Sequence, residues 1–235
     1  MTSNRNSPIP FRTLNSMPKN FPETPVKPFY RIGWNLSYSV FTTLYRFESY
    51  DSHHVPTRGP FLLAANHVSY LDPPAVGVSF RRPIHYFARD TLFKGPAERI
   101  LRGVNAVPVN NRGGSDLTAV RRALEVLKAG EGLLVFPEGT RSPDGNFLPA
   151  RRGIGLLACK GGVPVVPARL FGTYDALGRG RKPRLGVPLK VRFGPLLQPE
   201  DFDPGRTEKD RFDVAAENIM AAIRGIVEPA QPRAV

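Results

Sequence analysis

The sequence is short of the residues that build disulfides and metal sites. Cys159 is the only cysteine in 235 residues, so no intramolecular disulfide can form, and a reducing compartment fits best. The four histidines stand at positions 53, 54, 67 and 85, and no CxxC pair accompanies them. We therefore expect no metal site in this chain.

Long apolar runs and two common catalytic motifs are absent as well. The uncharged, aromatic-rich stretch at residues 32–45 has 14 residues, which is too short to span a bilayer as a helix. The first 28 residues are polar and proline-rich, so we expect no secretory signal. There is no GxSxG serine elbow and no GxxxxGK[ST] loop, which argues against an activated serine nucleophile and a P-loop enzyme.

Acidic residues are too few to balance the basic ones. The chain has 33 Lys and Arg against 20 Asp and Glu, a formal net charge of +13, and residues 160–195 are strongly basic. Such a surface suits anionic phospholipid headgroups, phosphorylated metabolites or nucleic acid, and a soluble basic protein without such a partner is the plain alternative. Because neither an aromatic RNA-binding signature nor a helix-turn-helix pattern is present, we expect no nucleic-acid partner.

Four segments follow one another along the chain. Residues 1–28 predict a disordered or extended N-terminal arm, because proline and polar residues leave no periodicity. Residues 29–50 predict an amphipathic membrane-interface helical segment, since Phe, Tyr and Trp favour that interface; a helix packed on the core is the alternative. Residues 51–228 predict a single domain, and 229–235 a C-terminal tail.

From residue 60 onward, short apolar runs alternate with helical patterns. Continuous apolar runs suit strands buried on both faces, and they occupy residues 61–65, 84–88, 105–109, 133–136 and 163–169. A half-exposed strand is expected at 187–193. One helix should begin at a Ser115 or Asp116 cap and carry a stripe of Leu117, Val120, Leu124 and Leu127; another should run from about 208 to 227. The pattern predicts an α/β fold: a largely parallel central sheet flanked by helices, with the N-terminal amphipathic helical segment.

A histidine and an aspartate follow the first of these strands in the stretch NHVSYLDPP. On one helix, His67 and Asp72 would point roughly 140° apart, and on one strand they would face opposite sides. A loop at the carboxyl end of the strand can bring them together, and Pro73 and Pro74 suit the first turn of a following helix. Asp72 would then fix the tautomer of His67 and leave its other nitrogen as a base. In the alternative, Asp72 caps the helix and His67 is an ordinary loop residue.

Two further segments repeat the arrangement of an apolar run followed by polar residues or proline. FPEGTRS places Glu138 and Arg141 in a loop after another predicted strand, where Arg141 could grip a phosphate through two bonds or simply join a surface ion pair. GVPVVPA, residues 162–168, carries two prolines in an apolar run, which favours an edge strand or the wall of a groove.

Together these segments resemble the glycerolipid acyltransferase family, which includes the lysophosphatidic acid (1-acylglycerol-3-phosphate) acyltransferases. The resemblance rests on four blocks in order, NHVSYLD, RGVNAVPVNNR, FPEGTRS and VPVVPA, and covers roughly residues 30 to 225. The first and third blocks, about 70 residues apart, are jointly a specific signal. Supporting matches are GPFLLAANH before the first block and LPARRGIGLLA after the third.

The resemblance implies roles for particular residues. His67 is implied as the general base and Asp72 as the residue that orients it, while Glu138, Gly139, Thr140 and Arg141 of the third block are implied to bind the acceptor phosphate. The second block departs from the family pattern. Asn110 and Asn111 stand where an acidic residue and an arginine are usual, and an arginine, Arg112, follows one place later. Arg112 therefore either takes over this contact or the contact is lost.

The resemblance also implies the reaction and its setting. An acyl group would move from acyl-CoA or acyl carrier protein to the hydroxyl of 1-acylglycerol-3-phosphate, giving phosphatidic acid, with no cofactor and no metal. The partners would be a lysophospholipid acceptor, an acyl thioester donor and an anionic membrane surface, at the cytoplasmic face of the membrane and without a span. Alternatives are another acceptor, such as glycerol-3-phosphate, another lysophospholipid or a lyso-aminolipid, or a membrane scaffold without activity. Arg179, Arg181, Lys182 and Arg184 could hold anionic lipid or the nucleotide end of the donor, or form a solvated loop.

Overall fold

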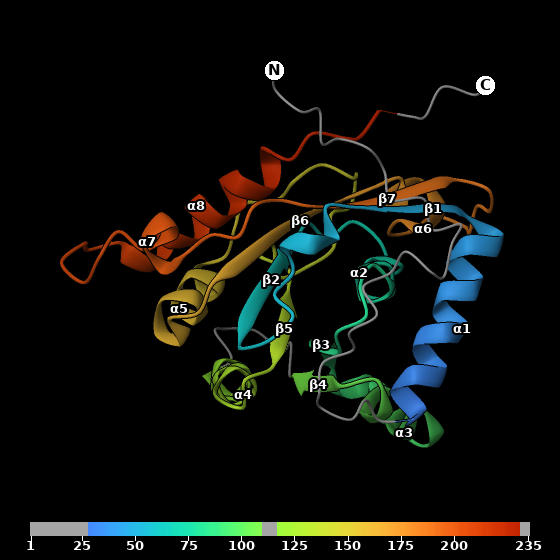
Figure 1. Cartoon of the computed structure of the whole chain (residues 1–235), viewed down its shortest axis with the longest axis horizontal. Coiled ribbons are helices and arrows are strands. Elements are labelled where there is room, and N and C mark those ends of the chain that lie inside the picture. The colour runs from blue at the N-terminus through green and yellow to red at the C-terminus, as the bar shows by residue number, and fades with distance from the viewer. Residues whose placement is uncertain (1–27, 110–116, 231–235) are drawn as a thin grey trace.

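The computed structural model describes residues 28–109 and 117–230 and shows one sheet between two layers of helices (Figure 1). The sheet has seven strands in the order β1-β7-β6-β2-β5-β3-β4, and every neighbouring pair is parallel except β6 and β7. The strands are β1 Arg46–Tyr50, β2 Phe61–Ala65, β3 Ile84–Arg89, β4 Ala106–Val109, β5 Gly132–Val135, β6 Val165–Phe171 and β7 Pro188–Phe193. The predicted α/β fold with a largely parallel sheet is confirmed.

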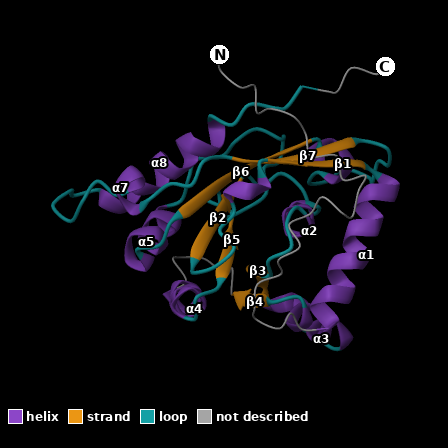
Figure 2. Ribbon diagram, viewed as in Figure 1, coloured by secondary structure: helices purple, strands orange, loops and turns teal. Residues whose placement is uncertain are grey.

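Helices cover both faces of this sheet (Figure 2). Helices α1 and α2 lie on one side of the strands, and α4, α5 and α8 lie on the other (Figure 1). The helices are α1 Pro28–Leu44, α2 Asp72–Val78, α3 Pro96–Gly103, α4 Leu117–Lys128, α5 Arg152–Gly161, α6 Thr173–Leu177, α7 Pro199–Phe202 and α8 Arg211–Arg224, with single 3₁₀ turns at Ser52–His54 and Asp90–Leu92.

The sheet separates two hydrophobic clusters. All five residues of β2 are buried, alternately in the cluster under α1 and α2 and in the cluster under α4, α5 and α8. This explains why the strand is a continuous apolar run rather than an alternating one. On the second face, α5 and α8 cross at Gly155, where a Cβ atom would lie 1.8 Å from the carbonyl oxygen of Phe212. Only glycine permits this close approach.

The two predicted helices of the domain are present with different bounds. Helix α8 begins and ends about three residues inside the predicted 208–227, and it buries Ala216, Ile219 and Ile223 on one side. In α4, Leu127 is buried and Leu124 packs against the same cluster. The predicted cap at Ser115 or Asp116 lies outside the described residues.

Three predictions about elements are wrong. The strand expected at 187–193 is present as β7, but it is mostly buried rather than half-exposed. Residues 46–50 are not helical: they form β1, which pairs in parallel with β7 from Arg46 opposite Pro188 to Tyr50 opposite Arg192. Of the two interpretations of the GVPVVPA segment, the edge strand is wrong, because β6 lies between β2 and β7. The missing N–H groups of its two prolines remove little of the hydrogen bonding between strands there. Pro164 precedes the strand, and Pro167 stands opposite Gly194, just beyond the last residue of β7.

Helix α1 is attached by one face and leaves an apolar face exposed. Tyr30 and Phe41 are buried, and the indole nitrogen of Trp34 donates to the carbonyl oxygens of Gly77 and Phe80, at 3.1 Å each. The opposite side exposes large apolar side chains, among which Ile32 and Leu36 are each 65% exposed; the others are Phe29, Val40 and Leu44. No helix within the described ranges is long and apolar enough to cross a membrane.

Candidate active site

The first and third sequence blocks meet because of the strand order. β2 and β5 are hydrogen-bonded neighbours and run parallel, so the loops that leave their carboxyl ends emerge at the same edge of the sheet. His67 follows β2 in one loop, and Glu138 and Arg141 follow β5 in the other. The two loops are joined directly, because the amide of Ser142 donates to the carbonyl oxygen of His67 at 2.8 Å.

His67 and Asp72 form the pair that the sequence predicts. The loop folds back so that Nδ1 of His67 lies 2.9 Å from Oδ2 of Asp72. The carboxylate is fully buried and also accepts from the amides of Val68 and Ser69, each at 2.7 Å. With Nδ1–H donating to Asp72, Nε2 carries the free lone pair, and the His67 side chain remains 17% exposed.

Helix capping by Asp72, which the alternative interpretation of the sequence required, is wrong. Asp72 is itself the first residue of α2, and its carboxylate bonds amides that precede the helix rather than those of its first turn. Pro73 and Pro74 occupy the first turn as predicted, where their missing N–H groups leave no bond unmade. Asp72 therefore shapes the loop and holds His67 at the same time.

Phe136 completes the support of His67 and was not singled out in the sequence. The two rings are stacked, with centroids 3.9 Å apart and planes 14° apart. Phe136 is the residue after β5, so its place against His67 depends on the pairing of β2 with β5. A single sequence does not reveal that pairing. The one available signal is that an aromatic residue, Phe136, begins the third block.

Glu138 is buried between the two loops, with 1% of its surface exposed. One carboxylate oxygen accepts from the amide of His67 at 2.9 Å and the other from the amide of Leu148 at 3.1 Å. Burial raises the pKa of this carboxyl, and the two amide bonds act in the opposite direction. The described contacts make Glu138 a brace for the His67 loop; its part in acceptor binding stays a prediction.

The remainder of the third block forms a tight turn over Arg151. Gly139 has a φ of 67°, and a Cβ atom there would lie 2.7 Å from the Cδ atom of Arg151. The Nε–H of Arg151 donates to the carbonyl oxygen of Glu138 at 3.1 Å. Thr140 is partly buried, and Arg141 turns toward the first block, with its guanidinium carbon 3.4 Å from the ring centroid of Tyr70. Tyr70 and Arg151 are therefore site residues that sequence reasoning did not name.

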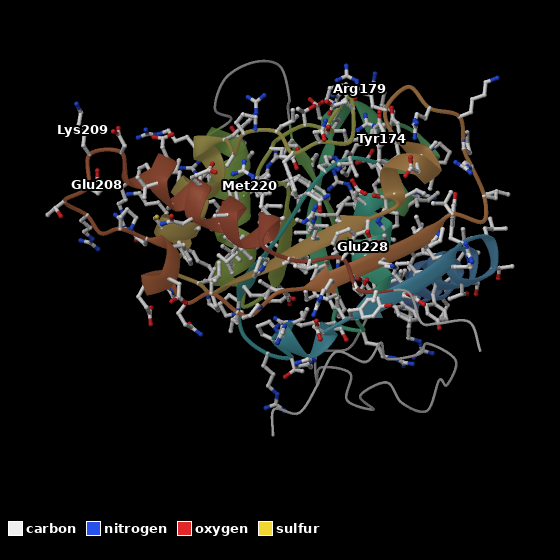
Figure 3. All side chains as sticks on the ribbon, turned by 90° about the horizontal axis from the view of Figure 1, so that it is seen from above. Tyr174, Arg179, Glu208, Lys209, Met220 and Glu228 are labelled. Atoms are coloured by element: carbon white, nitrogen blue, oxygen red, sulfur yellow. The ribbon has the colours of Figure 1, made fainter. Side chains whose placement is uncertain are left out.

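The remaining predicted binding residues are less constrained. Arg112, with Asn110 and Asn111, lies outside the described residues, so its role stays a prediction. Of the basic residues after α6, Arg181 pairs with Asp175 at 2.7 Å. The positive charge of Arg179 acts on Tyr70 together with Arg141, and Figure 3 shows Arg179 pointing outward at the edge that also carries Tyr174. Within residues 28–109 and 117–230, no three His, Cys, Asp or Glu side chains are grouped to hold a metal ion.

Comparison with known proteins gives a consistent set of relatives. A family model described as Acyltransferase matches residues 46–170. The 1-acyl-sn-glycerol-3-phosphate acyltransferase of Bacillus subtilis is 28% identical over 155 residues, which are 65% of this chain and 74% of the relative. The human 1-acyl-sn-glycerol-3-phosphate acyltransferase beta is 33% identical over 155 residues, 64% of this chain and 55% of its own length. The chain spans only 36% of the chloroplastic BAT2 enzyme of Brassica napus.

A solved structure agrees in fold as well as in sequence. The crystal structure of the 1-acyl-sn-glycerophosphate acyltransferase PlsC from Thermotoga maritima matches with a TM-score of 0.69 and 28% identity, over 83% of this chain and 77% of that one. The matched family region contains His67, Asp72, Glu138 and Arg141, and it spans more than half of the sequence. On that basis, this chain belongs to the acyltransferase family.

Proposed function

We propose that this protein acylates the free hydroxyl of 1-acyl-sn-glycerol-3-phosphate and so produces phosphatidic acid for phospholipid synthesis. The observation that carries the proposal is the His67–Asp72 pair beside Arg141: a base for a hydroxyl and a cation for a phosphate stand on adjoining loops. The names of the relatives agree with this acceptor. The donor is an acyl thioester, either acyl-CoA or acyl carrier protein.

The chemistry needs a single base. Nε2 of His67 takes the proton of the acceptor hydroxyl while its oxygen attacks the thioester carbonyl carbon. The tetrahedral intermediate collapses, the carbon–sulfur bond breaks, and His67 returns the proton to the departing thiolate. Asp72 favours the imidazolium that forms between these steps, and Phe136 keeps the ring in place. The products are the new ester and a free thiol, so atoms and charge balance without a cofactor.

The experiment is an assay of purified protein on mixed micelles with labelled acyl-CoA or acyl carrier protein. The acceptors are 1-acylglycerol-3-phosphate, glycerol-3-phosphate and a lysophosphatidylcholine. We expect phosphatidic acid to be the main product. Preference for glycerol-3-phosphate or for the zwitterionic acceptor would replace this function by the second candidate, to which the Asn110–Asn111 departure points. No acyl transfer with either donor would contradict both.

We further propose that the protein works at the cytoplasmic face of an anionic membrane, docked through α1. Large apolar side chains are also exposed on α3 and on the 3₁₀ turn before it, at Ile100 and Leu92. Phe29 of α1 lies directly against Gly103 of α3, and Figure 1 shows α3 beside the N-terminal end of α1. An apolar face of this kind on a chain with net charge +13 suits the boundary between headgroups and acyl chains.

A further inference from the structure

Arg141 has an unusual environment for an arginine beside a catalytic residue. Its Nη1 atom is buried and has no hydrogen-bond partner among the described residues. A guanidinium nitrogen left in this state is costly, because its lost hydration is not replaced. In the absence of an acceptor, this atom is therefore available for an anion that enters the site.

Tyr70 is the group that holds Arg141. The guanidinium carbon lies 3.4 Å from the centroid of the Tyr70 ring, so the cation rests on the aromatic face. The Tyr70 side chain is 57% exposed, so the site that it shares with Arg141 is open to solvent. Bonding from Arg141 and the positive charges of Arg141, Arg179 and Arg89 lower the pKa of Tyr70.

The backbone that carries Tyr70 is fixed on both sides. The amide of Tyr70 donates to the carbonyl oxygen of Leu177 at 3.4 Å, and the hydroxyl of Ser69 donates to the same oxygen at 2.7 Å. The Ser69 hydroxyl in turn accepts from the amide of Leu71 at 3.1 Å. The Tyr70 ring therefore stands on a loop that is tied to α6, and the same loop carries His67.

We propose that Tyr70 is a positioning residue for the acceptor phosphate, holding the guanidinium of Arg141 by one face so that its N–H edge remains free to bind the phosphate. This inference rests on the proposed function and deepens it. Contact through the face leaves guanidinium donors such as Nη1 free for the phosphate, whereas an acidic partner would occupy them and repel the phosphate. The arrangement also places the phosphate at a fixed distance from His67, because the rings of Tyr70 and His67 belong to one loop.

The test compares Tyr70→Leu with Tyr70→Phe in the acyl-transfer assay. Losing a cation–π contact should raise the KM for 1-acylglycerol-3-phosphate in Tyr70→Leu roughly 3- to 30-fold. The KM for the donor and the kcat at saturating acceptor should stay within about twofold. Tyr70→Phe should raise the acceptor KM less than Tyr70→Leu does, since it keeps the ring and loses only the hydroxyl that Arg141 bonds. Phe212→Leu is the matched control: it removes a ring that lies 5.3 Å from the Arg152 guanidinium, on α8 and outside both site loops.

Three results would overturn the inference. These are an unchanged acceptor KM in Tyr70→Leu, a loss confined to kcat, or equal losses in Tyr70→Leu and Tyr70→Phe. A monoacylglycerol acceptor, which lacks the phosphate, separates binding from misfolding, because its turnover should be the same in wild type and Tyr70→Leu. If Tyr70→Leu loses turnover with monoacylglycerol as well as with the phosphate-bearing acceptor, the inference is also overturned.

Failure of the proposed function is distinguishable from failure of this inference. If wild type does not acylate the phosphate-bearing acceptor, the function fails, and inorganic phosphate then decides the inference by its effect on the melting temperature. Phosphate should raise the melting temperature of wild type and Tyr70→Phe more than that of Tyr70→Leu. An equal rise in all three proteins, or no rise in wild type, would overturn it.

Discussion

His67 is held by a hydrogen bond at Nδ1, by stacking on its ring face and by a hydrogen bond from its backbone amide. These contacts leave Nε2 as the nitrogen that can take a proton. We expect His67→Ala to lower kcat roughly 10²- to 10⁴-fold, the usual contribution of a general base, with little change in melting temperature. His53→Ala is the matched control, because His53 packs on His54 rather than on the site. Steady-state kinetics and thermal unfolding measure the two effects; near-wild-type turnover by a folded His67→Ala protein would refute the base assignment.

Asp72→Asn should also lose activity, but it is less diagnostic. Oδ2 serves two backbone amides besides the imidazole, so the substitution disturbs the loop as well as the tautomer.

Arg141 and Arg112 are the two candidate anchors of the phosphate. Arg141→Lys replaces a planar fork by a point charge, so the KM for the phosphate-bearing acceptor should rise roughly ten- to a hundredfold, more than the KM for the donor. Arg112→Ala then distinguishes two arrangements of the second block: a similar defect means that the arginine has moved one place, and none means that Asn110 and Asn111 line a different pocket. If Arg141→Lys leaves the acceptor kinetics unchanged, Arg141 does not bind the acceptor phosphate.

At the scale of elements, α1 is the part of the fold whose exposed face calls for a partner. The double substitution Ile32→Asp with Leu36→Asp should reduce co-sedimentation with anionic vesicles several-fold, because two carboxylates replace two apolar side chains at the interface. Asn35→Asp is the matched control, since it adds negative charge to an exposed position of the same helix. Vesicle binding should also weaken as the salt concentration rises, because salt screens the attraction between the basic protein and the anionic lipid over a Debye length of about 8–10 Å. Equal binding of the double variant and the control would contradict docking through α1.

Sequence patterns located most elements of the sheet, and the misses have physical reasons. The run at residues 61–65 coincides with β2 because both faces of that strand are buried, which requires an unbroken apolar run. β1 was missed because RFESY follows α1 with only Tyr45 between them and holds Arg46 and Glu48. Pro167 suggested an edge strand, but the cost of its missing N–H depends on where the neighbouring strand ends, and a single sequence does not contain that information.

The candidate site was predictable in part for a related reason. The closeness of His67 and Asp72 follows from local loop geometry, so the sequence could indicate it. The stacking of Phe136 on His67, and the bond that the His67 amide donates to Glu138, need β2 beside β5. Strand order is a property of the whole sheet, and no local pattern specifies it.

For the whole molecule, the two edges of the sheet have different tasks. The site occupies the carboxyl edge of β2 and β5, and a buried arginine ties the amino edge. Arg82 donates to the carbonyl oxygens of Pro56, Gly59 and Gly130, at 2.9, 2.6 and 3.0 Å, and its guanidinium lies over the ring of Phe61. These carbonyls belong to the segments that lead into β2 and β5. Arg82 therefore joins the beginnings of the two strands whose ends carry the catalytic loops.

Removing that link should cost stability without changing the chemistry. Arg82→Met removes the donors of these three carbonyl oxygens, and we expect the free energy of unfolding to fall by about 2–4 kcal/mol, because hydrogen bonds to a charged group are the stronger kind. Arg152→Met is the control. It breaks an ion pair with Asp213 whose side chains are 56% and 50% exposed, and such a pair is worth about 1 kcal/mol or less. Urea unfolding measures both variants. At a temperature where Arg82→Met is folded, its kcat and acceptor KM should equal those of wild type. A changed KM with unchanged stability would mean that the amino edge of the sheet takes part in substrate binding, and the division between the two edges would not hold.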